Sequence, residues 1–213
     1  MNRAMIDDAI LADYASGALP PGMSLLVAAH LTFSPDARSR AAGFEAIGGA
    51  LLDAPALAGL SAPSLDAVLA RLDTPAPLPR AVRAPAAPSV MPRCLTDALG
   101  VSEHDAPWKF RLPGLAEAMI DGFDGEEVSF LRARPGAPIF AHTHEGVEAT
   151  LVLCGALEDR GQVFRRGDVA MATEADDHRP RILDEGLCIC FVVATGKMRF
   201  TGPFSRALNY LAD

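Results

Sequence analysis

Two histidines and a glutamate lie close together in the segment GAPIFAHTHEGVEATLVLCG, which begins at Gly136. In an extended strand, side chains at positions i and i+2 point to the same face. His142 and His144 can therefore converge on one ion without distortion of the backbone. Glu148 has the same parity, and Gly146 permits a bend or bulge that brings its carboxylate round to the histidines.

A third histidine, His178, follows a predicted turn at Gly167-Asp168. An H-x-H pair alone is a weak signal, but here three of the five histidines join a glutamate between apolar segments. Three imidazoles and one carboxylate suit a divalent transition metal that keeps an open position for water or another ligand. We therefore predict metal binding at this cluster.

The same spacing resembles the first cupin motif, G-x5-H-x-H-x3-E-x6-G, which the segment from Gly136 to Gly155 fits at every position. The second cupin motif is only partly present. Gly167 opens it and His178 supplies its histidine, but the usual Pro-x-Gly before the histidine is missing. Cupins are small double-stranded β-barrels. The resemblance implies four metal ligands: His142, His144, Glu148 and His178.

Beyond this metal set we predict no catalytic residue. Glu145 and Asp177 adjoin predicted ligands, but neighbours along a strand point to the opposite face. The four cysteines fit neither a disulfide framework nor a zinc-ribbon spacing. Cys188 and Cys190 belong to the run LCICFVV, which predicts a buried strand with structural thiols.

The composition argues against a nucleic-acid-binding protein and against a membrane protein. The formal net charge is -8 and the chain has only two lysines, whereas a nucleic-acid surface needs a basic patch to neutralise phosphates. No apolar run is long enough to span a membrane, and the acidic N-terminus does not resemble a signal peptide. We expect a cytoplasmic protein with reduced thiols and neither nucleic acid nor membrane among its partners.

The sequence predicts three parts: a helical domain over residues 1–73, a linker over 74–93 and a β domain over 94–213. The linker has six prolines in twenty residues. Because proline fixes φ and removes a backbone donor, this stretch can form neither a helix nor a central strand. We therefore expect an extended, semi-rigid linker.

Helical spacing, caps and breakers predict four helices in the first part, over residues 7–16, 21–33, 35–52 and 64–72. Short apolar pieces between turn residues predict the strands of a barrel or sandwich in the last part. These pieces span residues 128–134, 139–144, 148–153, 156–159, 162–164, 168–171, 178–182 and 187–194. A closing helix is predicted over 204–211.

Considered together, the two domains resemble the ChrR-type cupin anti-sigma factors over essentially the whole chain. The resemblance is carried by DAILADYASGAL from Asp8, SLLVAAHL from Ser24 and AGFEAIGGALL from Ala42, followed by the cupin motif. It implies an α+β protein with a small helical bundle and a C-terminal cupin. It also implies that the helices hold a sigma factor of the extracytoplasmic-function group, while the cupin senses a stress signal.

One motif of this family is degenerate. Its zinc-binding pattern H-x3-C-x2-C begins here at His30, but Ser34 and Ala37 stand where the cysteines belong, and no histidine precedes His30. Serine and alanine cannot replace thiolates, so we expect no zinc in the helical domain.

Two alternatives stay open at this point. The metal set would also suit a cupin enzyme, of dioxygenase or isomerase type, or a sensor that binds a small molecule without turnover. Zinc is the metal implied by the resemblance, although manganese, iron and nickel satisfy the same ligands. A homodimer stays open as well.

Overall fold

The computed structural model describes residues 6–53, 59, 64–72 and 88–202. Most of the predicted linker, from 74 to 87, and the predicted helix over 204–211 lie outside the described residues.

The four predicted helices are present: α1 (Asp8–Ser16), α2 (Pro21–Phe33), α3 (Pro35–Asp53) and α4 (Ser64–Leu72). Their ends follow local signals. The Asp7 side chain accepts a hydrogen bond from the Ile10 N–H and caps α1, which ends at Gly17 in the left-handed conformation. The Ser34 hydroxyl accepts from the Ala37 N–H and caps α3, which begins at Pro35.

A fifth helix, α5 (Arg93–Leu99), was not predicted. The sequence before it reads as linker because of its prolines, yet Pro92 occupies the N-cap position, where proline is tolerated. Residues just before the helix are fixed to the barrel. The Glu103 carboxylate accepts hydrogen bonds from the Ser89 hydroxyl and the Val90 N–H, and Met91 is buried.

The rest of the described chain is a β-barrel with a six-stranded, a three-stranded and a two-stranded sheet, all antiparallel. The six-stranded order is β1-β2-β3-β10-β5-β8, the three-stranded order β7-β6-β9, and β11 pairs with β4. Their bounds are β1 (Lys109–Leu112), β2 (Leu115–Ile120), β3 (Glu127–Ala133), β4 (His142–His144), β5 (Glu148–Cys154), β6 (Ala156–Asp159), β7 (Gln162–Arg165), β8 (Val169–Ala172), β9 (Arg181–Ile182), β10 (Cys188–Ala194) and β11 (Met198–Phe200).

Every predicted strand has a counterpart, but three observed strands were missed. Strand β2 reads LAEAMI, whose alanines and glutamate are poor strand formers, so its pairing with β1 and β3 defines it. Strands β1 and β11 are short edge pieces. Strand β9 is shorter than predicted, because His178 joins the barrel through an isolated bridge to His142.

The central strands β5 and β10 of the six-stranded sheet are buried on both faces. Along β5, Ala149, Leu151 and Leu153 belong to a core shared with the helices, whereas Val152 faces a second core inside the barrel. Along β10, Cys188 and Cys190 face that inner core, as buried thiols whose sulfur atoms lie 3.7 Å apart.

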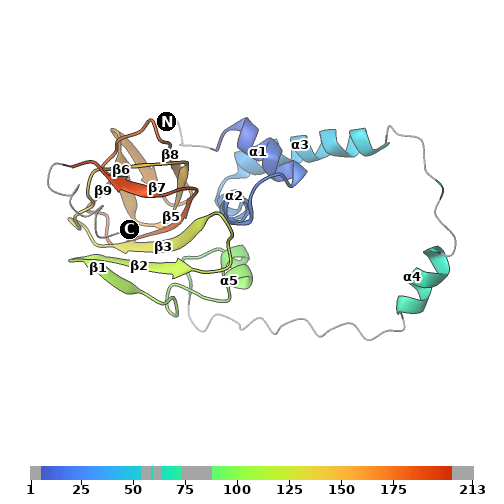
Figure 1. Ribbon diagram of the computed structural model, residues 1–213, viewed down its shortest axis with the longest axis horizontal. Coiled ribbons are helices and arrows are strands. Elements are labelled where there is room, and N and C mark those ends of the chain that lie inside the picture. Colours follow the sequence, from blue (N-terminus) through green and yellow to red (C-terminus); the bar gives the residue numbers. More distant parts are fainter. Residues whose placement is uncertain (1–5, 54–58, 60–63, 73–87, 203–213) are drawn as a thin grey trace.

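The helices differ in whether they pack on the barrel. Helix α2 lies against it and contacts β5, β10 and α5, while α1 packs on α2 and α3. Figure 1 shows α3 extending away from the barrel and α4 standing apart from the other elements. Among the described helices, none combines the length and the apolar character that crossing a membrane requires.

Candidate metal centre

The four predicted ligands meet inside the barrel. One ligand atom from each of His142, His144, Glu148 and His178 lies within 4.8 Å of the others. His142 and His144 come from β4, Glu148 opens β5, and His178 is placed opposite His142 by two backbone hydrogen bonds of 3.0 Å. This set could hold a metal ion.

Gly146 lies in the bend between the two histidines of β4 and Glu148. A Cβ atom at this position would come within 1.7 Å of the Thr195 carbonyl oxygen. Only glycine therefore allows the chain to turn here against β10. The predicted role of Gly146, to bring Glu148 round to the histidines, agrees with this geometry.

The distances between donor atoms fit a transition metal. His144 Nε2 lies 3.2 Å from His178 Nε2 and 3.4 Å from Glu148 Oε2. Two donors that are each about 2.1 Å from a metal, at an angle of about 100°, would be roughly 3.2 Å apart. These two pairs thus have the spacing of ligands around a single ion.

Hydrogen bonds fix which nitrogen of two rings is available. His142 Nδ1 donates to the Phe140 carbonyl at 2.8 Å, and His178 Nδ1 lies 3.0 Å from Asp159 Oδ2. Both interactions leave Nε2 as the coordinating atom. The Thr150 hydroxyl donates to Glu148 Oε1 at 3.3 Å, so Oε2 is the carboxylate oxygen that faces the histidines.

Burial shifts the pKa values of three predicted ligands and so determines which protonation states they favour. It lowers the pKa of His144 to about 4, helped by the neighbouring His142 and His178, and it also lowers the pKa of His142. Burial raises the pKa of Glu148. Neutral imidazoles are the form that binds metals, and a divalent cation would compensate a carboxylate that has lost much of its water.

Asp159, at the end of β6, is a functional residue that the sequence analysis missed. Its carboxylate is buried against His178 and accepts a second hydrogen bond from Arg160 Nε at 3.1 Å. Burial raises the pKa of Asp159, but the hydrogen bond to His178 and the charge of Arg160 outweigh burial and hold that pKa below its usual value. In sequence, Asp159-Arg160-Gly161 looks only like a turn.

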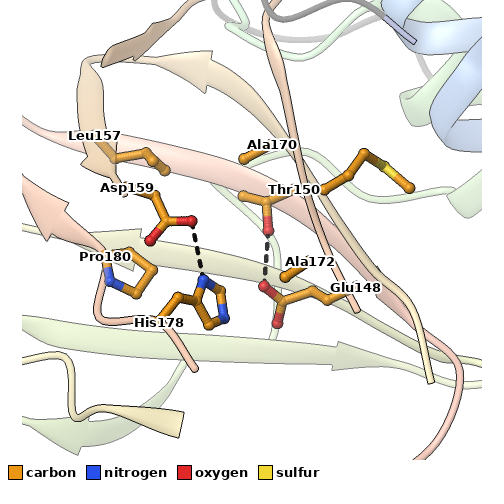
Figure 2. Close-up of a pocket in the computed structure, with 9 residues that line it drawn as sticks. Glu148, Thr150, Leu157, Asp159, Ala170, Ala172, His178 and Pro180 are labelled. Carbon is orange, nitrogen blue, oxygen red and sulfur yellow. Dashed lines mark hydrogen bonds and ion pairs between the residues drawn. The ribbon is translucent and has the colours of Figure 1, made fainter. Parts of the chain in front are cut away.

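A small pocket adjoins the centre (Figure 2), and its free space of about 20 Å³ is enough for about one water molecule. Glu148 and His178 reach it from the metal side, and Asp159 and Thr150 add polar atoms to its wall. Among the residues that the structure describes, no lysine or arginine lines it. The other lining residues are Leu157, Ala170, Met171, Ala172 and Pro180.

The acidic neighbours of the ligands are turned away, as predicted from strand alternation. Glu145 forms an ion pair with Arg199, and Asp177 accepts a hydrogen bond from the Thr201 hydroxyl. Both carboxylates are thus engaged by partners other than the ligands.

In the helical part, the residues at the degenerate zinc motif have other contacts. His30 is buried and its Nδ1 lies 2.8 Å from the Gly167 carbonyl oxygen, on the barrel. Ser34 caps α3 and Ala37 is fully buried. The positions that the family uses for thiolates are thus filled by a helix cap and by apolar packing.

Comparison with known proteins identifies relatives over nearly the whole chain. The family model described as the ChrR cupin-like domain matches residues 96–199. The anti-sigma-E factor ChrR of Cereibacter sphaeroides is 37% identical over 205 residues, which cover 93% of this chain and 92% of that protein. The crystal structure of Rhodobacter sphaeroides SigE in complex with the anti-sigma ChrR aligns with a TM-score of 0.75 and 33% identity, over 91% of this chain and 100% of that one.

Proposed function

This chain belongs to the ChrR family of cupin-containing anti-sigma factors, and we propose that its helices bind a sigma factor of the extracytoplasmic-function group. Binding would keep that sigma factor from core RNA polymerase, while the cupin responds to a stress signal. The relative of known structure was crystallised with SigE, which supports a sigma factor as the partner class here.

The observation that carries this proposal is an exposed apolar surface on α3 and α4. Its large side chains range from 50% exposed for Leu69 to 83% for Leu52. On α4 they recur at the spacing i, i+3, i+4 and i+7, which places them on one helix face. The surface consists of Ile47, Leu51, Leu52, Leu65, Val68, Leu69 and Leu72.

A simpler explanation for the α4 leucines would be packing on the other three helices. Every described side chain of α4 is exposed, which supports a partner for these leucines rather than packing on the other helices. An amphipathic helix that leaves its apolar face open is suited to bind a groove or helix of another protein. Exposed apolar area of this kind typically marks an interaction site.

At the cupin, we infer one divalent ion per chain. His142, His144 and His178 would hold it through ring nitrogens, and Glu148 would supply a carboxylate oxygen and a negative charge. Zinc is favoured by the family resemblance, with manganese, iron and nickel as alternatives. When bound, the ion would offer an open coordination position to water or a similarly small ligand in the adjacent pocket.

Binding of the sigma factor can be tested with the full chain. Each extracytoplasmic-function sigma factor of the source organism would be co-expressed with it, and complexes would be measured by size-exclusion chromatography and by inhibition of transcription from purified core polymerase. We expect a stable complex with one such factor. Leu69→Asp should weaken it about tenfold or more, because it introduces a charge into an apolar interface.

Ala67→Asp is the matched control, since Ala67 lies on the opposite side of α4 from the leucines and is also exposed. It should leave affinity within about twofold, as surface substitutions usually do. If no sigma factor forms a complex while the metal-loaded chain converts a small molecule, the enzyme alternative replaces this proposal.

A further inference from the structure

Helix α2 receives its N-terminal cap from the barrel rather than from its own sequence. Pro20 occupies the N-cap position and makes no side-chain capping bond. Instead, the Gly22 and Met23 N–H groups donate to the two carboxylate oxygens of Glu126, at 2.6 and 2.8 Å. Glu126 is buried and is more than a hundred residues away in sequence. A carboxylate at this position accepts from helix N–H groups that would otherwise stay unpaired. Its negative charge also interacts favourably with the positive end of the helix dipole.

The backbone of α2 lies very close to the sheet at this point. A Cβ atom on Gly22 would be 2.8 Å from Val128 Cγ2 and 2.9 Å from Glu126 Oε2. Val128 is fully buried in β3, and a β-branched side chain in a packed strand has little freedom to move. The absence of a side chain at Gly22 thus permits the two carboxylate bonds.

The middle of α2 belongs to the same core as the sheet. Leu26, Val27 and Ala29 are fully buried, and they share one cluster with Leu151 of β5 and Phe191 of β10. The apolar face of the helix is therefore covered in part by the barrel.

The C-terminal end of α2 is bound to the turn between β7 and β8. His30 Nδ1 lies 2.8 Å from the Gly167 carbonyl oxygen, and the Arg166 guanidinium lies 5.0 Å from the centroid of the Phe33 ring. The Gly167 N–H in turn donates to the carbonyl of Val152, in β5. This contact thus connects the end of α2 to the strand that carries Glu148.

We propose that α2 and the barrel form one cooperative folding unit, in which Glu126 caps the helix from the cupin and the His30–Gly167 contact fixes its other end. Since α1 and α3 pack on α2, α1 and the first part of α3 are ordered only while α2 is docked. The helical part then depends on the cupin for its structure, although the two are separated in sequence.

The first test is hydrogen exchange with mass spectrometry on the full-length protein. Glu126→Gln removes the charge and replaces one acceptor by an amide donor. We expect amides of α1, α2, the first half of α3 and β10 all to exchange about tenfold faster, because one folding unit opens as a whole and loses charge-assisted hydrogen bonds. Glu127→Gln is the matched control, because Glu127 is the exposed neighbour and should change nothing.

Gly22→Ala tests the same contact without altering charge, and it should also loosen the three helices. Its control is Gly43→Ala, since a Cβ atom on Gly43 of α3 meets nothing within 4 Å. Unchanged helix protection in both Glu126→Gln and Gly22→Ala would overturn the proposal.

A second test uses the unmodified protein and therefore does not depend on any variant. Trp108, the single tryptophan, lies in the cupin part of the chain, so its fluorescence reports on the cupin while far-UV circular dichroism reports mainly on the helices. One folding unit requires both signals to change at the same urea concentration. Loss of helicity at lower urea, with the Trp108 signal intact, would show independent domains and overturn the proposal.

Discussion

His178 is the predicted ligand that comes from outside the β4–β5 segment, and its ring is oriented by Asp159. The carboxylate holds Nδ1 and so directs Nε2 towards His144. Arg160 contacts Asp159 and also donates to the Met171 carbonyl, which ties this arrangement to the pocket wall. Such outer contacts tune a metal site because they fix the tautomer and raise the basicity of the ligand.

Replacement of Asp159 should weaken metal binding without removing any ligand. We expect Asp159→Asn to lower metal affinity about 10- to 100-fold, since partners of ligating histidines commonly have effects of this size. Affinity would be measured by competition with a chromophoric chelator, at a temperature where both metal-free proteins are folded. For comparison, His142→Ala with His144→Ala should abolish metal content.

Glu158→Gln is the control for Asp159→Asn, because Glu158 is the adjacent residue on β6 and pairs with Arg181 at the surface. Equal affinities for Asp159→Asn and the unmodified protein would reject the orienting role of Asp159. Full metal content in the double histidine variant would reject the ligand assignment itself.

At the scale of elements, α3 has two unlike halves. Its first turns are capped by Ser34, and Ala37 and Ala41 are buried against the neighbouring helices. Its last residues, including Gly48 and Gly49, are exposed. Each of these glycines costs about 1 kcal/mol relative to alanine in a helix. The second half of α3 therefore gains little stability from contacts within the chain. This is expected of a surface that a partner protein covers.

The cap of α3 should matter for stability. Ser34→Ala removes the acceptor of the Ala37 N–H and should lower the free energy of unfolding by about 1 kcal/mol, the usual cost of losing a serine cap. Urea titration of the full-length protein would measure it. Ser39→Ala, at an exposed position inside α3, should leave stability unchanged or raise it slightly. Equal values for the two variants would mean that the Ser34 hydroxyl contributes nothing.

Elements defined by local signals could be predicted from the sequence, and those defined by distant contacts could not. Asp7, Gly17 and Pro35 mark helix ends by rules that act within a few residues, and the parity of β4 aligns two histidines locally. By contrast, β2 is formed by pairing with β3, and Asp159 meets His178 only because β6 and the His178 segment converge. The Glu126 cap spans too much sequence for any local pattern to indicate it.

For the whole molecule, strand β5 connects the two functional regions. Glu148 and Thr150 face the centre and the pocket, whereas Ala149 and Leu151 face the core that contains α2. A change in the position of β5 would therefore alter both the metal centre and the packing of α2. This common strand offers a physical route by which events at the cupin could reach the helices that we propose bind a sigma factor.

The last prediction concerns cleavage of the chain between its two parts. The sequence from Thr74 to Ala87 has four prolines and few apolar anchors, which favours proteolysis there before cleavage of packed strands. Brief trypsin treatment should cut after Arg80 or Arg83. Because α2 is docked on the barrel, the two fragments should still elute together in native size-exclusion chromatography and separate only in denaturant.

The Glu126→Gln variant supplies the comparison. Once cut, it should release its N-terminal fragment more readily, because two hydrogen bonds to the start of α2 are weakened. A first cut within the strands between 109 and 200 would refute the predicted division into two parts. Separation of the fragments of the unmodified protein would instead show that the linker, and not the interface of α2 with the barrel, keeps the helices on the cupin.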